Sequence, residues 1–224
     1  MKRKNSMLIL PVLIVYLIVF YGIWTIWEFW VKSFISSTFE NECISQVIKS
    51  GVIKNLVWTF PAILLVQHFN SEVHITLREM FFTKVNLLKY LPVFIFFTVY
   101  VLAGSILQNG RLEIVKEFGF DKIIIVLFVG LTEEMVFRGW LLNATIRENK
   151  KWFYIIINAV MFLAIHFPKW IHNGTFFSSF ASFQFLEVMV LSIIFSCTFI
   201  KSRNILVPIT LHMYFDLLVF MFIC

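Results

Sequence analysis

Long apolar runs alternate with short charged segments along most of this chain. The runs cover about residues 7–30, 51–69, 87–107, 122–145, 152–167, 183–200 and 205–223. Most of them approach the roughly 20 apolar residues that an α-helix needs to cross a bilayer. The pattern therefore predicts an all-α, polytopic membrane helix bundle with about seven transmembrane helices.

The segments between the runs predict the connections. Residues 31–50 mix polar and apolar positions without periodicity, so we expect them outside the hydrocarbon. Pro168 follows the run 152–167 and predicts the end of that helix. Residues 70–85 are typical of an interfacial amphipathic helix, because charges are spread among their apolar positions: Glu72, Arg78, Glu79 and Lys84.

Composition excludes a soluble fold. The 224 residues are 60% hydrophobic and only 14% charged, whereas soluble domains have about 25% charged residues. No internal repeat separates the chain into units, so residues 1–224 are predicted to form one integral-membrane domain, with its motifs in the half 122–224. The net charge of +6 is modest and the basic residues lie between apolar runs, which gives no case for nucleic-acid binding and favours membrane lipid as a partner.

Basic residues also predict the orientation. The chain begins Lys2-Arg3-Lys4, and more lysines and arginines lie on that side of the predicted bundle than on the other. Such residues remain preferentially in the cytoplasm. We therefore expect a plasma-membrane protein with a cytoplasmic N-terminus.

The run 122–145 contains two acids and a base, which are expensive to place near the bilayer centre. On a helix, Glu134 and Arg138 are four residues apart and lie only about 40° apart around the axis. Glu133 lies about 140° from Arg138, so the arginine does not neutralise both acids equally. This geometry predicts a structural acid, Glu134, beside a working acid, Glu133.

Two later runs add further polar groups. Asn158, Phe162 and His166 follow one another at steps of four and share a helix face, as do His212 and Asp216. Taken alone, the His166 set is better explained by buried hydrogen-bonded packing, and the His212–Asp216 pair is explained equally well by it. Three spans that each carry such groups favour a common interior cavity, in which they suffice to activate water and stabilise an oxyanion.

These residues resemble the signature motifs of a known family. The resemblance rests on four stretches in chain order: Glu133-Glu134-x-x-x-Arg138, Phe162-x-x-x-His166, Ser202-Arg203-Asn204-Ile205 with Pro208, and His212-x-x-x-Asp216. They are similar to the motifs of the CPBP intramembrane proteases, the CAAX-processing and bacteriocin-processing (Abi) group. The resemblance implies an endopeptidase whose active site lies within the bilayer region and whose substrate is a peptide or protein.

The resemblance also implies a role for each residue. Glu133 is expected to be the general base and His166 to orient the water. His212 is expected to bind the oxyanion, with Asp216 fixing its tautomer. A further set is expected to hold these groups in place: Glu134, Arg138, Asn158 and Phe162.

Two alternatives concern a metal. Glu133, His166 and His212 are ligand types for a zinc site with an open fourth position. The same groups also suffice without a metal, if Glu133 activates water directly. No His-Glu-x-x-His motif is present to decide between a glutamate-type protease and a metalloprotease.

Two other functions compete with proteolysis. One is a bacteriocin-immunity or partner-binding membrane protein that retains the scaffold without turnover. The other is a small proton-coupled transporter that uses Glu133, Glu134 and Asp216, although the chain lacks the repeats that such transporters contain. Among protease substrates, the sequence leaves open a lipidated peptide, a bacteriocin precursor and a membrane-anchored regulator.

Overall fold

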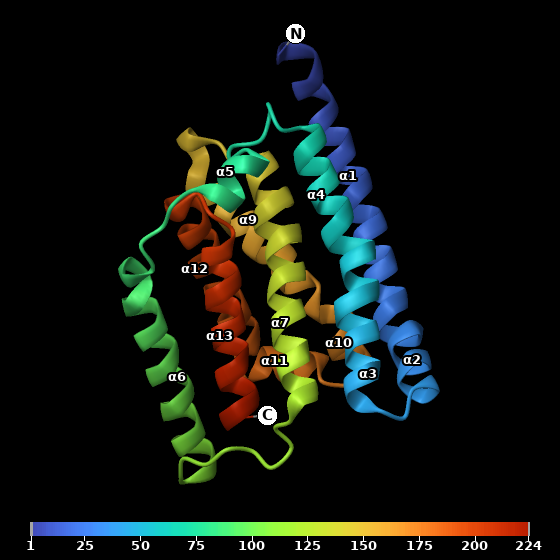
Figure 1. Ribbon diagram of the computed structural model, residues 1–224, viewed down its shortest axis with the longest axis vertical. Coiled ribbons are helices and arrows are strands. Elements are labelled where there is room, and N and C mark those ends of the chain that lie inside the picture. The colour runs from blue at the N-terminus through green and yellow to red at the C-terminus, as the bar shows by residue number, and fades with distance from the viewer. Residues whose placement is uncertain (1, 224) are drawn as a thin grey trace.

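The computed structural model describes residues 2–223, with side chains from residue 9 onward. Within that range every element is helical, and the long helices run alongside one another as a bundle (Figure 1). This arrangement confirms the predicted all-α, polytopic architecture. The basic side chains at the start of the sequence, used above for orientation, lie outside the described residues.

Several helical elements follow one another without a break, so that one span often contains two or three of them. In chain order they are α1 (Lys2–Ile26), η1 (Trp27–Val31), α2 (Lys32–Thr38), α3 (Glu42–Gln46), η2 (Val47–Ile53), η3 (Asn55–Thr59), α4 (Phe60–His68), α5 (Leu77–Phe82), η4 (Leu87–Tyr90), α6 (Leu91–Asn109), α7 (Phe120–Glu134), η5 (Met135–Leu142), α8 (Asn143–Thr145), η6 (Glu148–Lys150), α9 (Lys151–Ala164), α10 (His166–His172), α11 (Phe176–Ala181), α12 (Gln184–Ser202) and α13 (Leu206–Phe222).

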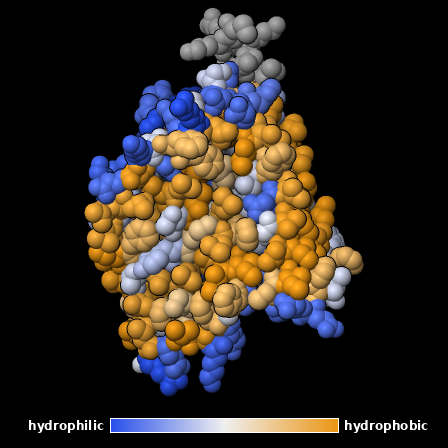
Figure 2. Space-filling model, in the orientation of Figure 1, coloured by the Kyte–Doolittle hydropathy of each residue, from blue (hydrophilic) through white to orange (hydrophobic). Residues whose placement is uncertain are grey.

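Five helical stretches within the described range are long and apolar enough to cross a membrane: Ile9–Thr38, Glu42–His68, Leu87–Asn109, Glu148–His172 and Gln184–Ser202. The two other predicted spans are also helices. The α7–η5–α8 stretch is a continuous helix whose apolar sequence is interrupted by the charged motif. α13 is an apolar helix of 17 residues, slightly shorter than these five stretches. The surface has an apolar belt with polar ends (Figure 2). The protein is therefore an integral membrane protein.

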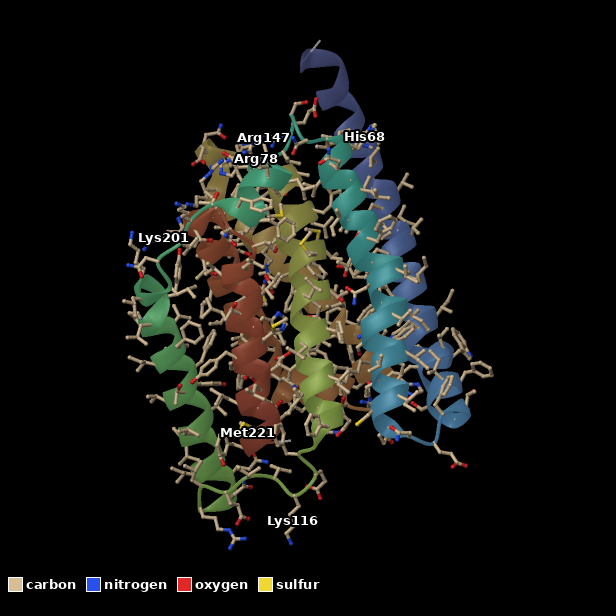
Figure 3. The ribbon with its side chains drawn as sticks, viewed as in Figure 1. His68, Arg78, Lys116, Arg147, Lys201 and Met221 are labelled. Atoms are coloured by element: carbon tan, nitrogen blue, oxygen red, sulfur yellow. The ribbon has the colours of Figure 1, made fainter. Side chains whose placement is uncertain are left out.

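The connections alternate between the two ends of the bundle, as predicted. Arg78, Arg147 and Lys201 lie at the end where the N-terminus is located, and Lys116 lies at the opposite end (Figure 3). Arg78, Lys116 and Arg147 follow the second, third and fourth predicted spans, and Lys201 lies in the last turn of the sixth, α12. Each of the spans therefore traverses the bundle once.

Residues 31–50, which we expect outside the hydrocarbon, are almost entirely helical. The first helix continues to Thr38 and the next begins at Glu42, which leaves only a short turn between them. The polar side chains satisfy one another within this helical hairpin, as when the Lys49 amine donates to the Ser36 hydroxyl at 2.9 Å. The lack of apolar periodicity therefore reflects two helix ends that pair through polar groups.

The predicted helix end at Pro168 was wrong. The helix is interrupted at Ile165 and resumes as α10, with Pro168 in its first turn. A proline is tolerated there because backbone N–H groups in the first turn of a helix need no partner within that helix. A short helix that the sequence did not indicate, α11, follows before α12.

The interfacial helix is shorter than the predicted segment 70–85. Only α5 is helical, and its start is fixed by a capping box. Thr76 accepts from the Glu79 backbone N–H at 3.3 Å, and the Glu79 carboxylate accepts from the Thr76 backbone at 2.9 Å. The preceding residues form turns, one of which is anchored by Asn143, whose amide donates to the Ile75 carbonyl at 2.8 Å.

α5 holds the corner between α12 and α13. The chain reverses at Arg203, which has a φ of 54°, and its guanidinium donates to Glu79 at 3.1 Å. The Asn204 amide donates to the Thr83 carbonyl at 2.8 Å, and the Ile205 N–H donates to the Met80 carbonyl at 2.8 Å. This docking sets the position from which α13 enters the bundle.

We predict that the docking of α5 weakens in acid. The pKa of Glu79 lies below its ordinary value of 4.5 because Thr76 donates to the carboxylate and Arg203 attracts it. A carboxyl with a depressed folded pKa contributes stability above its unfolded pKa and loses it as the pH falls through the folded pKa. Thermal unfolding between pH 6 and 3 should therefore change less with pH in Glu79→Gln than in wild type. Identical pH profiles would contradict the contribution.

α7 and α13 approach closely at Gly130. A Cβ at this position would lie 2.8 Å from the Met213 Cγ and 3.3 Å from its backbone nitrogen. We expect Gly130→Ala to lower the free energy of unfolding by about 1–3 kcal/mol, as overpacking does. Gly104→Ala in α6 is the matched control, because its nearest contact would be an ordinary 3.7 Å from Ile223. Equal effects in both variants, measured by unfolding in mixed micelles, would show that Gly130 is not a contact point.

Candidate active site

The motif helix changes its winding at the predicted site. α7 ends at Glu134 and continues as a π-helical stretch, η5, which widens the helix where the charged residues lie. Glu134 and Arg138 are fully buried, and their oxygen and nitrogen are 2.9 Å apart, which confirms the predicted pair. The side chain of Glu133 is 14% exposed and forms no ion pair with Arg138 among the described residues. The two acids therefore have different surroundings.

The Arg138 guanidinium ties three helices together. It donates to the Ser192 hydroxyl at 2.8 Å and to the Ser192 carbonyl at 3.0 Å on α12. Its carbon lies 4.5 Å from the ring centre of Phe162 on α9 and 5.4 Å from that of Phe195 on α12. These contacts offset part of the cost of burying a charge. They fix the motif helix against α9 and α12.

His212 lies between the carboxylates of two helices. Its Nδ1 is 2.8 Å from the Glu134 carboxylate, and its Nε2 is 3.9 Å from Glu133 and 3.5 Å from Asp216. We predicted that Asp216 fixes the tautomer of His212. In the structure Glu134 contacts Nδ1, while Asp216 lies beside Nε2. Glu134 therefore links Arg138 to the imidazole, a connection that helical spacing alone does not reveal.

Aromatic rings hold the His212 imidazole in place. Phe195 stacks on it with ring centres 4.8 Å apart and an interplanar angle of 18°, and Phe162 meets it edge-on at 6.0 Å. Phe195 was not among the predicted site residues, because a phenylalanine in a phenylalanine-rich span gives no signal of its own. These rings exclude water from one side of the site and strengthen its electrostatic interactions.

His166 faces the same aromatic residue from the other side. The ring centres of Phe162 and His166 are 5.5 Å apart, so Phe162 contacts both imidazoles. The His166 Nδ1 lies 3.1 Å from the Phe162 carbonyl. A carbonyl only accepts, so this hydrogen bond requires a proton on Nδ1 and leaves Nε2 of the neutral ring as an acceptor.

Asn158 and two serines complete the packing of α9, η5 and α12. The Asn158 amide donates to the Phe137 carbonyl at 2.9 Å, and its oxygen accepts from the Ser196 hydroxyl at 3.3 Å. Ser192 and Ser196 are buried and four residues apart, so they share one face of α12. Two small polar residues four positions apart within an apolar span are the sequence pattern that could have identified these serines as packing residues.

The described donors do not form a metal centre. No group of three or more His, Cys, Asp or Glu side chains in residues 2–223 is arranged to hold a metal ion. Of the predicted zinc ligands, His166 engages the Phe162 carbonyl, and His212 engages Glu134 through Nδ1. These contacts leave the Nε2 atom of each ring available, so the zinc set stays a prediction, and no step below passes through a metal.

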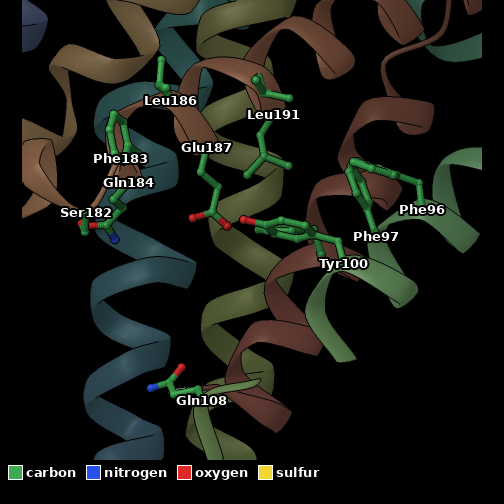
Figure 4. Close-up of a pocket in the computed structure, with 12 residues that line it drawn as sticks. Phe96, Phe97, Tyr100, Gln108, Ser182, Phe183, Gln184, Leu186, Glu187 and Leu191 are labelled. Atoms are coloured by element: carbon green, nitrogen blue, oxygen red, sulfur yellow. The ribbon is translucent and has the colours of Figure 1, made fainter. Parts of the chain in front are cut away.

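A separate cavity of about 720 Å³ lies between α6, α12 and α13. None of the predicted site residues lines it. Glu187 of α12 points toward the hydroxyl of Tyr100 of α6 across its wall (Figure 4). Phe215 of α13 also lines the cavity and directly precedes Asp216 in the sequence.

Residues 117–218 match the family model described as Type II CAAX prenyl endopeptidase Rce1-like. This part of the chain is Rce1-like. The match includes all four stretches named above and confirms the predicted resemblance to the CPBP group, while the first spans lie outside it. No curated protein and no solved structure matched the chain. Within the Rce1-like segment, the motif residues come from α7, η5, α9, α10 and α13 and converge on His212 and Phe162.

Proposed function

We propose that this protein is an intramembrane endopeptidase of the CAAX-protease type, in which Glu133 activates the water that hydrolyses a peptide bond. The observation that carries the proposal is the network around the His212 imidazole. It contacts the partly exposed carboxylate of Glu133 and the buried carboxylate of Glu134, both from the helix packed against its own. The Rce1-like match supports the same reaction class. Glu134, Arg138, Asn158 and Phe162 position these groups without touching the substrate.

The geometry favours a water between Glu133 and His212. Their nearest atoms are 3.9 Å apart, too far for a direct hydrogen bond. Two groups that share a water at about 2.8 Å lie about 4.5 Å from each other, so a small adjustment admits one. Glu133 accepts a proton from this water, and the resulting hydroxide attacks the carbonyl carbon of the peptide. We propose that His166, through its Nε2, orients the same water.

The next step places negative charge on the former carbonyl oxygen. Carboxylates beside both nitrogens of His212 stabilise its doubly protonated form, whose Nε2–H then donates to the oxyanion. The C–N bond breaks, and the proton held by Glu133 passes to the leaving amine. One peptide bond and one water thus become a carboxylic acid and an amine, and Glu133 is ready for another turnover.

We propose a substrate that is itself associated with the membrane. A site enclosed by apolar spans favours a lipidated peptide or a bacteriocin precursor over a soluble protein. We place the protein in the plasma membrane with a cytoplasmic N-terminus, because the connections on the N-terminal side carry Arg78, Arg147 and Lys201.

The test is a cleavage assay with the purified protein in detergent. The probes are quenched fluorescent peptides, one with a prenylated cysteine near its C-terminus and one with the same sequence unmodified. We expect cleavage of the prenylated peptide, undiminished by a chelator and by removal of bound metal as checked by metal analysis. No cleavage of either peptide by folded protein would refute the proposal, and activity that depends stoichiometrically on zinc would refute its metal-free mechanism.

A further inference from the structure

A lysine outside the matched segment lies beside the candidate site. Lys54 belongs to the second span, Glu42–His68, which packs along α7. Two contacts fix the height of this span against α7. Gly51 faces Phe128, and the Thr59 hydroxyl lies 3.3 Å from the hydroxyl of Thr132, which precedes Glu133. Lys54 therefore lies, along its span, between the levels of Phe128 and Thr132 on the helix that carries the proposed base.

Two tryptophans of the first span hold the Lys54 amine. Its Nζ lies 4.8 Å from the ring centre of Trp24 and 5.8 Å from that of Trp27. The Trp24 indole donates to the Ile165 carbonyl at 2.8 Å, immediately before His166. The first span, the second span and the start of α10 thus meet around this amine.

The Lys54 cation has no anion of its own. No ion pair or hydrogen bond of its amine is formed with any described side chain, whereas Lys32 of the same region pairs with Glu28 at 3.1 Å. The acids whose charges act on Lys54 are Glu133 and Glu28, and the cations Lys32 and Lys169 add positive charge around it. The Lys54 residue as a whole is intermediate in exposure, and its amine lies against the two indole rings. A cation held by aromatic faces and lacking a partner among the described side chains is suited to bind an anion.

We propose that Lys54 binds a carboxylate of the substrate peptide beside the proposed catalytic water. This inference rests on the proposed function and adds a specificity residue from the N-terminal half of the chain. The carboxylate belongs either to the peptide's C-terminus or to an acidic side chain. In both cases the ion pair with Lys54 fixes the peptide relative to Glu133, and it acts mainly on binding.

The experiment compares three quenched peptides of one sequence. The first ends in a free carboxylate, the second in a carboxamide, and the third is the carboxamide with one glutamate side chain added on the C-terminal side of the cleaved bond. The enzymes are wild type, Lys54→Met, Lys54→Gln and Lys54→Arg. Lys49→Met is the matched control, because Lys49 is a buried lysine of the same span that donates to Ser36.

We expect Lys54→Met and Lys54→Gln to raise KM for the carboxylate-bearing peptide about tenfold or more while kcat changes little. A tenfold change corresponds to about 1.4 kcal/mol of binding. Lys54→Arg and Lys49→Met should keep the wild-type preference for a carboxylate over the carboxamide. The peptide that shows the dependence, the first or the third, identifies the source of the carboxylate. Equal effects of Lys54→Met on all three peptides, or a change in kcat alone, would overturn the proposal.

Binding separates this proposal from the proposed function. The same peptides are titrated by fluorescence polarisation into Glu133→Gln protein with and without Lys54→Met. Tighter binding of the carboxylate peptide that requires Lys54 supports the site even if wild type cleaves nothing, in which case the protease reading alone fails. Binding that is indifferent to the carboxylate would contradict the Lys54 site even if cleavage is observed.

Discussion

Glu133→Gln should abolish peptide cleavage while leaving the protein folded. Glutamine keeps the size of the side chain but cannot accept a proton from water, so we expect a loss of about 100-fold to 10,000-fold in kcat. Glu133 forms no pair with Arg138, and its nearest charged contact, His212, is 3.9 Å away, so we expect the loss of its charge to cost little stability. The measurement is the initial rate of cleavage, with thermal unfolding recorded on the same preparation.

Glu117→Gln provides the control, since this glutamate precedes α7 in an exposed connection. It should cleave at the wild-type rate. A Glu133→Gln protein that still cleaves rapidly would remove Glu133 as the base, and one that fails to fold would assign it a structural role.

The second large effect is on stability. Replacing either Glu134 or Arg138 with alanine leaves an uncompensated charge in a fully buried position. Breaking a buried pair in this way costs roughly 3–5 kcal/mol in soluble proteins. We expect a loss of that order in the free energy of unfolding in mixed micelles. Each single variant also removes a second contact, since Arg138 donates to Ser192 and Glu134 contacts His212.

The double variant should lose less than the sum of the two single variants, because it leaves neither charge alone. The exposed pair Arg111–Glu113 is the matched control, and its removal should cost no more than about 1 kcal/mol. Additive losses for Glu134 and Arg138 would show that the pair contributes no coupling energy.

The helical spans and the pairing on the motif helix were accessible from the sequence. Long apolar runs determine where helices lie, and a spacing of four places Glu134 beside Arg138 and separates Glu133 from it. Local geometry determined both results, and the structure confirms the pair. The catalytic roles of Glu133, His166, His212 and Asp216 remain predictions.

Contacts between helices were not accessible in the same way. Glu134 contacts His212, Arg138 contacts Ser192, and the Lys54 amine lies over Trp24. Each of these pairs is far apart in sequence, and the rotation of each helix about its axis is set by packing of the whole bundle. Sequence spacing on a single helix specifies a face but does not specify which partner that face meets.

Helix boundaries were less accessible from the sequence. Residues 31–50 lack apolar periodicity because their polar groups have partners across a hairpin, such as Lys49 and Ser36. Pro168 was predicted to end its helix because the break at Ile165, which places the proline in a new first turn, leaves no separate mark in the sequence.

The most direct measurement is mass spectrometry of a membrane-reconstituted reaction in heavy-oxygen water. The protein is placed in lipid vesicles with the prenylated peptide, and the products are compared for wild type and Glu133→Gln. We expect wild type to give two fragments from one cleaved bond, with a single heavy oxygen in the new carboxyl terminus, and Glu133→Gln to give neither. Intact peptide after incubation with folded wild type, or the same labelled fragments from Glu133→Gln, would contradict hydrolysis by a water that Glu133 activates.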